Sequence, residues 1–387
     1  MADVRPFRGV RYAAASLGCA LCPPYDVISA ELAKKLRRVR SNAVFLELPE
    51  GSGDRRYARA AGVWRRWIVE GLLVRDPQQA FYAVEESFRW NGRVRVRRGF
   101  LGALSVEPKH ARDIIPHERT LAKPKADRLK MLDQVGVNTS PIFGVYGDPS
   151  GAARRALARA MRGRPAATGR SHAGVDYRLW VVEQAGLISS LRKALSSRSI
   201  LIADGHHRFA VSGDYHRRTG GPGSGAVLTY FVADEDDGLV VLPTHRIAKR
   251  PLRERAAQYA GLTLVANLAE LNRRVAESEN PYAFGLIENG FYFGEPKPNA
   301  CRSGLAVEWL AAHLLAEIAP DQMSYTPDSA VAAKAAESAA ACAVLVKPFG
   351  VAQVRRAAKT VGLLPQKSTY FFPKIATGLV FRSLDGE

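Results

Sequence analysis

The chain has 387 residues, more than one hydrophobic core usually supports, so two or three domains are expected. Apolar residues make up 47% and charged residues 24%, a balance that argues against extensive disorder. Lysines and arginines number 56 against 37 aspartates and glutamates, and the net charge of +19 favours anionic partners such as nucleotides, phosphorylated metabolites or nucleic acid.

The N-terminus lacks the apolar run of a signal peptide, and no later segment has the roughly 20 apolar residues that cross a bilayer. We therefore expect a cytoplasmic protein with no membrane partner. The four cysteines are too few for a disulfide framework. Cys19 and Cys22 form a single C-x-x-C pair, whereas Cys301 and Cys342 stand alone, so neither a structural zinc site nor a redox role is expected.

Residues 1–150 are expected to form an N-terminal mixed α/β domain built around a sheet. Helices are predicted over residues 29–38 and 55–70, and strands over residues 79–90 and 94–106. The Asn91-Gly92 pair between the two strands is a strong hairpin signal. The basic run of the second strand, at Arg93, Arg95, Arg97 and Arg98, is interpreted as a solvated face.

The composition shifts to Ala, Arg and Gly over residues 149–174, and a domain boundary or an insertion is expected there. Residues 175–250 are expected to form a compact α/β unit, and residues 251–387 a C-terminal α/β region. The strands predicted over residues 226–233 and 239–243 are expected to pair with each other. Further elements are predicted over residues 152–162, 177–183, 189–195 and 304–318, with a hairpin at Asn289-Gly290. The fold class is therefore mixed α/β.

The most informative motif follows an apolar strand at residues 200–203. It reads Asp204-Gly205-His206-His207-Arg208, and a helix is predicted to begin after it. A turn between a strand and a helix leaves backbone N–H groups unpaired beside Arg208, which attracts an anion such as phosphate. His206 and His207 could add hydrogen-bond donors, a proton-transfer group or a metal ligand.

A second cluster, His117-Glu118-Arg119, also follows an apolar step. Glu118 is the best candidate for a general base, because a carboxylate near cations stays ionised and can accept a hydroxyl proton. The alternative makes Glu118 a structural ion-pair partner of Arg119 or Arg128.

Two further segments carry polar groups. Near the C-terminus, Lys367 could bind a phosphate or a carboxylate, or the lysines could flank a buried aromatic strand. In Pro23-Pro24-Tyr25-Asp26, Asp26 could supply an acidic ligand or cap the helix that follows. Neither a G-x-x-x-x-G-K-[ST] loop nor a G-x-G-x-x-G turn is present, so a nucleotide site would be of another kind.

Five separated motifs, in this order, resemble those of the domain of unknown function 1015 family, and the resemblance covers nearly the whole chain. The motifs are Pro23-Pro24-Tyr25-Asp26-Val27-Ile28-Ser29, Pro116-His117-Glu118-Arg119-Thr120, Asn138-Thr139-Ser140-Pro141-Ile142-Phe143, Asp204-Gly205-His206-His207-Arg208 and Lys367-Ser368-Thr369-Tyr370-Phe371-Phe372-Pro373-Lys374. The family name leaves the reaction open.

The turn at Asp204 to Arg208 is also similar to the phosphate-binding G-x-x-R turn of the ParB and sulfiredoxin superfamily. That superfamily includes nucleotide-dependent free serine kinases with a D-G-H-x-R turn and an upstream glutamate as base. The resemblance implies that Glu118 is the counterpart of this glutamate. The departure is the spacing, because about 85 residues separate the two motifs, more than a compact module of this type needs.

The first hypothesis is a nucleotide-dependent phosphotransferase acting on a small hydroxylated metabolite such as serine, with ATP or another nucleotide and Mg²⁺ as cofactors. The predicted roles are catalysis by His117, Glu118 and His207; phosphate or nucleotide binding by Arg119, Gly205, His206, His207, Arg208 and Lys367; metal binding by Asp26 and Asp204; and substrate binding by Tyr25, Ser368, Thr369 and Lys374.

Two alternatives stay open. The positive charge and the ParB-like turn suggest a nucleic-acid-binding or regulatory protein in which a nucleotide acts as a switch. A metal-dependent phosphoesterase could instead be built on His117, Asp204, His206 and His207, because imidazole is a ligand for transition metals.

Overall fold

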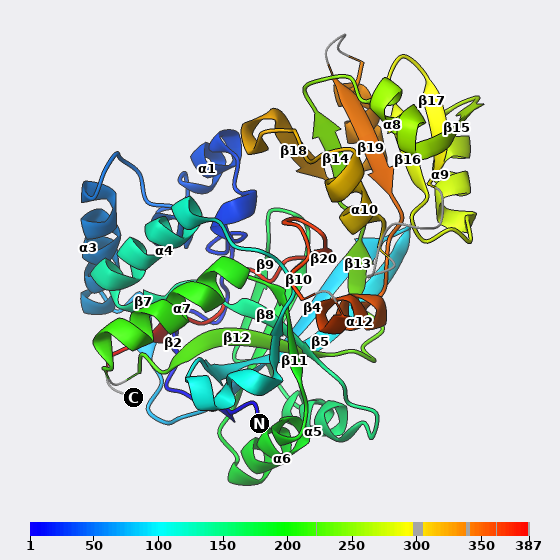
Figure 1. Cartoon of the computed structure of the whole chain (residues 1–387). Coiled ribbons are helices and arrows are strands. Elements are labelled where there is room, and N and C mark those ends of the chain that lie inside the picture. The colour runs from blue at the N-terminus through cyan, green and yellow to red at the C-terminus, as the bar shows by residue number, and fades with distance from the viewer. Residues whose placement is uncertain (222, 297–304, 338–340, 361, 386–387) are drawn as a thin grey trace. The chain divides into compact units, whose positions relative to one another are not determined.

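A computed structural model describes residues 1–221, 223–296, 305–337, 341–360 and 362–385 (Figure 1). Cys301 and the first residue of the helix predicted over 304–318 lie outside this range. The contacts divide the chain into two compact units: unit 1 comprises Met1–Ile115, Thr120–Val240 and Pro373–Glu387, and unit 2 comprises Pro116–Arg119 and Val241–Phe372. The three-part division expected from the sequence stays a prediction, because grouping by contacts does not test which segments fold alone.

Unit 1 is built on a mixed sheet, as predicted. Its strands are β1 (Val4–Arg5), β4 (Phe81–Trp90), β5 (Arg93–Ser105), β6 (Ile114–Pro116), β8 (Ile142–Tyr146), β9 (Ala167–Arg170), β10 (Asp176–Val182), β11 (Ile200–Asp204) and β12 (Ala226–Ala233). Neighbouring strands follow the order β6-β11-β8-β12-β5-β4-β10-β9, and β1 pairs with β5. The pairing of β12 with β8 is parallel, and that of β12 with β5 is antiparallel.

The helices of unit 1 lie in the connections between these strands. They are η1 (Tyr25–Val27), α1 (Ala30–Leu36), α2 (Val44–Glu47), α3 (Arg55–Val69), η2 (Pro108–Asp113), α4 (Ala122–Val135), α5 (Ala152–Ala160), α6 (Ala185–Ser196) and α7 (His206–Thr219). Two short strand pairs complete the unit: β2 (Val10–Tyr12) with β3 (Leu73–Arg75), and β7 (Val137–Asn138) with β21 (Arg382–Ser383). Among the described residues, no helix combines the length and the apolar character needed to cross a bilayer.

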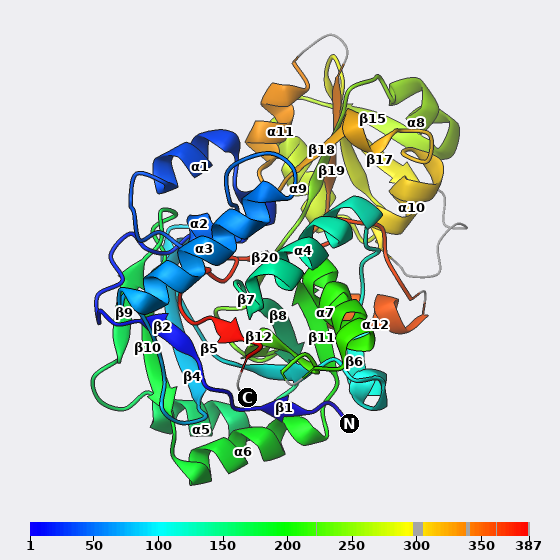
Figure 2. The same cartoon turned by 90° about the vertical axis from the view of Figure 1, so that its left-hand side faces the viewer.

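The two faces of the large sheet have different surroundings. Helices α5 and α6 run side by side along one face (Figure 2), where Leu157, Leu191 and Leu195 pack against Phe100 and other buried strand residues. Side chains alternate along a strand, so Arg97 of β5 points to the opposite face. Its guanidinium lies there over the rings of Phe143 and Tyr230. The first face packs into the hydrophobic core, whereas the second face holds the buried guanidinium of Arg97.

The structure confirms a helix cap and two hairpin turns that the sequence predicted. At each of these positions, neighbouring residues are sufficient to set the backbone conformation. Ser29 caps α1 by accepting a hydrogen bond from Leu32 N (3.1 Å). Asn91 and Gly92 have φ of +47° and +75° and turn β4 into β5. Asn289, with φ of +51°, lies in the predicted second hairpin.

One predicted pairing is wrong. Strand β12 pairs with β5 and β8, whereas the strand after it, β13 (Val240–Leu242), pairs with β20 (Tyr370–Phe372). The chain leaves unit 1 after Val240, so most of β13 belongs to unit 2, and the turn after β12 joins two strands that do not pair with each other.

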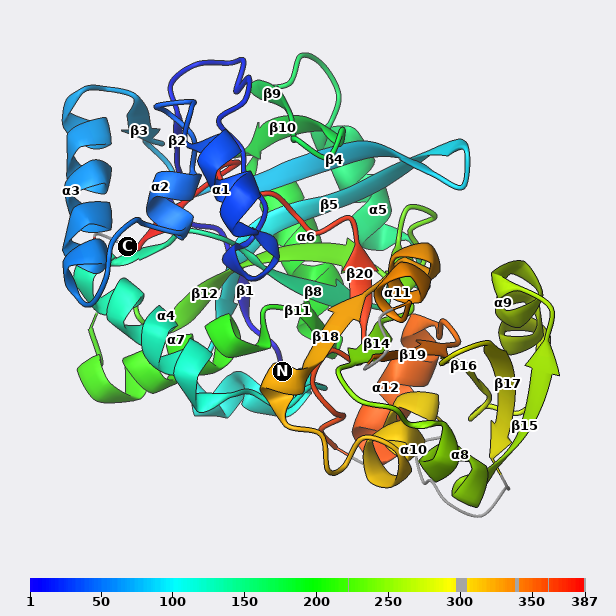
Figure 3. The same ribbon diagram turned by 90° about the horizontal axis from the view of Figure 1, so that it is seen from above.

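Unit 2 is a sheet with helices on both sides (Figure 3). Its strands are β14 (His245–Ala248), β15 (Ala260–Val265), β16 (Phe284–Ile287), β17 (Phe291–Pro296), β18 (Met323–Thr326) and β19 (Cys342–Val346), in the order β15-β17-β16-β19-β14-β18. Its helices are α8 (Arg253–Tyr259), α9 (Leu268–Glu277), α10 (Ala306–His313), η3 (Pro320–Gln322), α11 (Ser329–Ala335) and α12 (Val351–Thr360). Along β19, Val344 packs in the cluster with α8 and α10, and its neighbour Leu345 packs in the cluster with α9 and α11.

Candidate functional site

A glycine turn joins β11 to α7, as the sequence predicted. Gly205 has φ of +88°, and a Cβ at this position would lie 2.7 Å from Ile142 Cγ2, so both the backbone conformation and the available space require glycine. The first hydrogen bond of the helix runs from Phe209 N to Gly205 O (2.9 Å). The N–H groups of the three preceding residues therefore have no acceptor within the helix.

Replacing Gly205 with alanine is expected to lower the free energy of unfolding by about 2–4 kcal/mol, because a left-handed conformation and a steric clash each cost about 1–3 kcal/mol. Urea unfolding followed by circular dichroism measures the change. Gly186→Ala is the matched control, because an added Cβ in α6 meets no atom within 4 Å and should raise the free energy of unfolding by about 0.5–1 kcal/mol. A Gly205→Ala protein as stable as the wild type would contradict the requirement for glycine.

Arg208 lies in the first turn of α7, and its side chain is only 10% exposed. Nη1 donates to Ser140 Oγ (2.9 Å) and to Pro141 O (2.5 Å), and Nη2 donates to Asp204 Oδ2 (2.7 Å). Burial by itself lowers the pKa of Arg208, but the nearby carboxylates, with Asp204 first, outweigh it and raise the pKa overall. The guanidinium is thus a fixed positive charge at the start of the helix.

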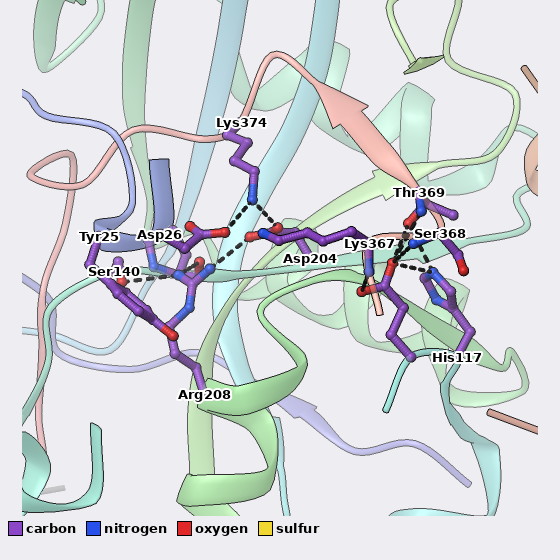
Figure 4. Close-up of polar contacts among 12 residues, drawn as sticks. Tyr25, Asp26, His117, Ser140, Asp204, Arg208, Lys367, Ser368, Thr369 and Lys374 are labelled. Carbon is purple, nitrogen blue, oxygen red and sulfur yellow. Dashed lines mark hydrogen bonds and ion pairs between the residues drawn. The ribbon is translucent and has the colours of Figure 1, made fainter. Parts of the chain in front are cut away.

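Lys374 lies between two carboxylates (Figure 4). Its Nζ donates to Asp204 Oδ1 (2.5 Å) and to Asp26 Oδ2 (2.9 Å), and its side chain is 8% exposed. Burial alone lowers the pKa of Lys374, but attraction by Asp204 and Asp26 raises it overall. Asp204 therefore bridges two cations, one at each oxygen. We call Asp26, Asp204, Arg208 and Lys374 the Asp204 network.

Arg97 fixes the chain next to Lys374. It is fully buried, its Nε and Nη2 lie 2.6 and 2.8 Å from the carboxylate of Glu86, and Nη2 also donates to Pro373 O (2.6 Å). The interpretation of the basic run as a solvated face is therefore wrong for Arg97. It is correct for the exposed Arg93 and Arg98, because the outer end of the long strand β5 remains open to solvent.

Glu47 lies behind the Asp204 network, and sequence reasoning missed it. Its fully buried carboxylate accepts hydrogen bonds from Tyr25 N (3.0 Å), Thr139 Oγ1 (2.7 Å) and Ser140 Oγ (2.9 Å). Ser140 in turn accepts from Arg208, so one serine links the carboxylate to the guanidinium. A lone acidic residue within the apolar run of residues 44–48 was the available signal.

Tyr25 packs beneath a second arginine. The guanidinium of Arg128 lies 4.1 Å from the centre of its ring and donates to Glu47 O (3.0 Å). Burial raises the pKa of Tyr25 to about 12, so the phenol remains a neutral hydrogen-bond donor at neutral pH. Tyr25, predicted to contact substrate, thus lies in the same cluster as the Asp204 network (Figure 4).

The two histidines of the turn have different surroundings. His206 is buried, with 7% exposure. His207 Nε2 accepts a hydrogen bond from Leu121 N (2.9 Å), the residue that precedes α4. A ring nitrogen that accepts from a backbone N–H carries no proton, so in this geometry the proton of the neutral ring lies on Nδ1. The predicted catalytic role of His207 stays a prediction.

In unit 2, the carboxylate of Glu118 holds a turn formed by residues 367–369. Oε2 accepts from Lys367 N (3.2 Å), and Oε1 accepts from Ser368 N (3.0 Å) and Thr369 N (3.1 Å). Lys367 has φ of +58°, a left-handed conformation that a non-glycine residue adopts at a cost. Glu118 thus stabilises a strained turn that belongs to the C-terminal motif.

His117 and the two hydroxyls of the motif complete this second cluster (Figure 4). His117 Nε2 lies 2.9 Å from Thr369 Oγ1, and Ser368 Oγ donates to Pro365 O (2.6 Å). Both His117 and Ser368 are fully buried. Arg119 joins through its backbone, whose N–H donates to Leu364 O (3.2 Å). In this structure the two hydroxyls shape the turn, and their predicted contact with substrate stays a prediction.

His245 and Arg246 lie beside the second cluster on β14. Arg246 Nη2 donates to Lys367 O (3.4 Å), and burial lowers the pKa of Arg246 to about 10. His245 Nδ1 accepts from Val346 N (3.2 Å). Burial, followed by the charge of Arg246, lowers the pKa of His245 to about 4.

The depressed pKa of His245 predicts a loss of stability in acid. Unfolded His245 binds a proton below pH 6.5 whereas folded His245 does so only below about 4, so its contribution is present above 6.5 and is lost as the pH falls between these values. The free energy of unfolding should fall by at most about 1.4 kcal/mol per pH unit. Urea unfolding from pH 7 to 4 measures it, with His245→Asn as the variant that accepts the same hydrogen bond without titrating. Parallel curves for the two proteins would contradict the prediction.

The structure thus brings the predicted site residues together in two clusters, one within each unit. Unit 1 holds Tyr25, Asp26, Asp204, Gly205, His206, His207, Arg208 and Lys374, and unit 2 holds His117, Glu118, Arg119, Lys367, Ser368 and Thr369. No group of three or more His, Cys, Asp or Glu side chains is placed to hold a metal ion in the described part of the chain. The phosphoesterase and nucleic-acid alternatives stay predictions.

A profile of the family described as "Protein of unknown function (DUF1015)" matches residues 4–315. This match confirms the resemblance identified from the motifs, although it ends before the Lys367 to Lys374 segment. No curated protein matches the chain.

Several solved structures are similar at low scores. A variant of free serine kinase in complex with ADP has a TM-score of 0.38 and 13% identity, over 67% of this chain and 84% of that one. A conserved hypothetical protein from Pyrococcus furiosus has a TM-score of 0.38 and 14% identity, over 68% and 89%. A C-terminally truncated SbnI from Staphylococcus aureus has a TM-score of 0.39 and 10% identity, over 72% and 85%. Likenesses of this size assign no activity to the chain.

Proposed function

The chain belongs to the family described as "Protein of unknown function (DUF1015)", and we propose that it is a nucleotide-dependent phosphotransferase acting on a small hydroxylated metabolite such as serine. The observation that carries the proposal is the Asp204 network at the start of α7. Two buried cations, Arg208 and Lys374, are fixed there by the carboxylates of Asp204 and Asp26.

This arrangement suits a phosphate because phosphoryl transfer depends chiefly on positioning and on neutralising charge. The N–H groups of His206, His207 and Arg208 begin a helix, whose dipole favours an anion. Gly205 allows the backbone to turn without a side chain in the way, and Arg208 can contact phosphate oxygens with its planar donors. The phosphate or nucleotide binding predicted for Arg119 and Lys367 stays a prediction.

In the proposed reaction, the bond between the terminal phosphorus and its bridging oxygen breaks and a bond to the metabolite oxygen forms. The hydroxyl proton passes to Glu118, and the nucleoside diphosphate leaves. In the described residues, Glu118 Oε2 accepts one hydrogen bond and Oε1 accepts three, so Oε2 is the oxygen assigned to the proton. His117 positions Thr369, and Tyr25, Ser368, Thr369 and Lys374 are assigned to the acceptor.

Mg²⁺ is the metal that a nucleotide substrate normally brings to such a site. Asp26 Oδ2 and Asp204 Oδ1 both contact one cationic atom, Lys374 Nζ, so the two carboxylates already converge on a position for positive charge. Because Lys374 Nζ fills that position, the two carboxylates do not fit Mg²⁺ as they are placed, and their role as metal ligands stays a prediction.

Nucleotide binding and turnover test the proposal. Purified protein should show a rise in Tm with ADP or ATP in the presence of Mg²⁺, and it should form ADP from ATP with at least one of serine, threonine, homoserine and glycerate. Arg208→Gln should lose the nucleotide-dependent rise in Tm. Arg217→Gln, which removes an exposed arginine of the same helix, should keep it. Absence of both the Tm rise and the turnover in the wild type would overturn the proposal.

A further inference from the structure

Unit 1 contains a cavity of about 720 Å³ where the loop at residues 16–21, helix α1 and the β9–β10 hairpin meet. None of its lining residues belongs to the Asp204 network. A cavity of this volume is in the range that small-molecule sites occupy.

The walls of the cavity are fixed without a ligand. Leu17 N donates to Thr168 O (2.8 Å), which ties the loop to β9. Asn42 is fully buried, and its Nδ2 donates to Cys19 O (2.6 Å) and Leu21 O (3.1 Å), which sets the curvature of the loop. Because the backbone is held on both sides, the cavity is a preformed feature of the fold.

Positive charge outweighs negative charge around the cavity. Lys35, Arg170 and Arg178 line it, and Asp176 is the one acidic residue among the lining residues that the structure describes. Arg170 lies 3.6 Å from Asp176, and Arg178 lies 3.3 Å from Glu85, so both arginines already have carboxylate partners. Lys35 forms no ion pair within the described residues, so its charge remains for a ligand.

A histidine and several apolar side chains line the cavity together with Lys35. Burial, followed by the charge of Lys35, lowers the pKa of His172, so this imidazole is neutral at neutral pH and can donate or accept a hydrogen bond. Leu21, Leu36 and Val39 supply apolar wall. An ammonium group, a neutral imidazole and an apolar surface together match an anionic head on an apolar body.

We propose that this cavity binds a small organic carboxylate with an apolar body, with the carboxylate at Lys35 and the body against Leu21, Leu36 and Val39. The inference is independent of the proposed phosphotransferase activity, because neither the ligand class nor the lining residues depend on a nucleotide.

Cys19 provides a reporter for occupancy. It lines the cavity and its thiol is exposed, whereas Cys22 and Cys342 are buried. In a full-length Cys301→Ser background, 1-naphthoate should slow the alkylation of Cys19 by iodoacetamide, by about tenfold when its concentration is about ten times Kd. 1-Naphthylmethylammonium, which has the same aromatic body and the opposite charge, should give no protection. Peptide mass spectrometry measures alkylation at Cys19.

Two neighbouring lysines of α1 test the assigned contact. Lys35→Gln should weaken the protection by 1-naphthoate about tenfold in Kd, because it removes a charge-assisted hydrogen bond. Lys34→Gln, which removes the same charge from a residue that does not line the cavity, should leave Kd unchanged. Equal protection by the ammonium compound, equal effects of the two substitutions, or no protection by 1-naphthoate up to its solubility would each overturn the proposal. All of these measurements are made without nucleotide.

Discussion

Replacing Glu118 with glutamine is expected to lower kcat for phosphoryl transfer by about 10²–10⁴-fold, the contribution typical of a general base. The glutamine oxygen can still accept hydrogen bonds from the turn at residues 367–369, but the neutral amide cannot take a proton from the acceptor hydroxyl. The Kd for nucleotide should change little. Steady-state turnover with whichever of the four tested acceptors supports ADP formation, together with nucleotide titration, measures both quantities.

The chain offers a matched control for this substitution. Glu288 also lies in unit 2, and its Oε2 accepts hydrogen bonds from Leu252 N (2.6 Å) and Arg253 N (2.9 Å). Glu288→Gln should weaken these two hydrogen bonds and lower the free energy of unfolding by about 1–2 kcal/mol. It should leave kcat unchanged. If both variants lose the same fraction of kcat, Glu118 acts through the fold of unit 2, and its assignment as the base is wrong.

Replacing Lys374 with methionine should lower the free energy of unfolding by about 3–5 kcal/mol, because it removes the cation between two carboxylates in a buried site. The raised pKa of Lys374 means that its contribution is fully present below the unfolded value of about 10.4 and is lost only as the pH rises through the folded value. The difference between wild type and variant should therefore be constant from about pH 6 to 9. Urea unfolding at several pH values measures it.

Two further variants show how much of the stability lost in Lys374→Met comes from repulsion between Asp26 and Asp204 and how much from lost packing of the side chain. Lys130→Met removes an exposed ion pair with Asp54 that solvent screens, and it should change the free energy of unfolding far less than Lys374→Met does. Adding Asp26→Asn to Lys374→Met leaves Asp204 paired with Arg208 alone and should recover part of the loss. A Lys374→Met protein no less stable than Lys130→Met would show that the ammonium group is not a buried link of the Asp204 network.

Many elements of the fold follow from local signals. The cap at Ser29, the left-handed residues at Asn91 and Gly92, and the glycine turn at Gly205 act on their immediate neighbours, so the sequence predicts them. The partner of β13 was not predictable in this way. Strand pairing depends on the path of the whole chain, and the chain leaves unit 1 after Val240, the first residue of β13.

The sequence likewise identified some residues of the candidate site and missed others. Residue type and position relative to a strand end identified Asp204, Arg208 and Glu118 as chemically active candidates. They did not identify Glu47, because a single glutamate in a short helix gives no hint that Thr139 and Ser140 donate to it. Arg97 illustrates the opposite error, since alternation along β5 shows which face it occupies but not what covers that face.

The sequence by itself determined the family and the mixed α/β class, and it named the residues that we propose bind phosphate or accept a proton. These properties depend on residue chemistry and short-range geometry, which neighbouring positions carry. Only the tertiary structure decided that Lys374 pairs with Asp26, 348 positions away, and with Asp204. Tertiary folding brings together charged residues that are far apart in the chain. Because such an ion pair is buried, removing one partner costs much of the free energy of unfolding.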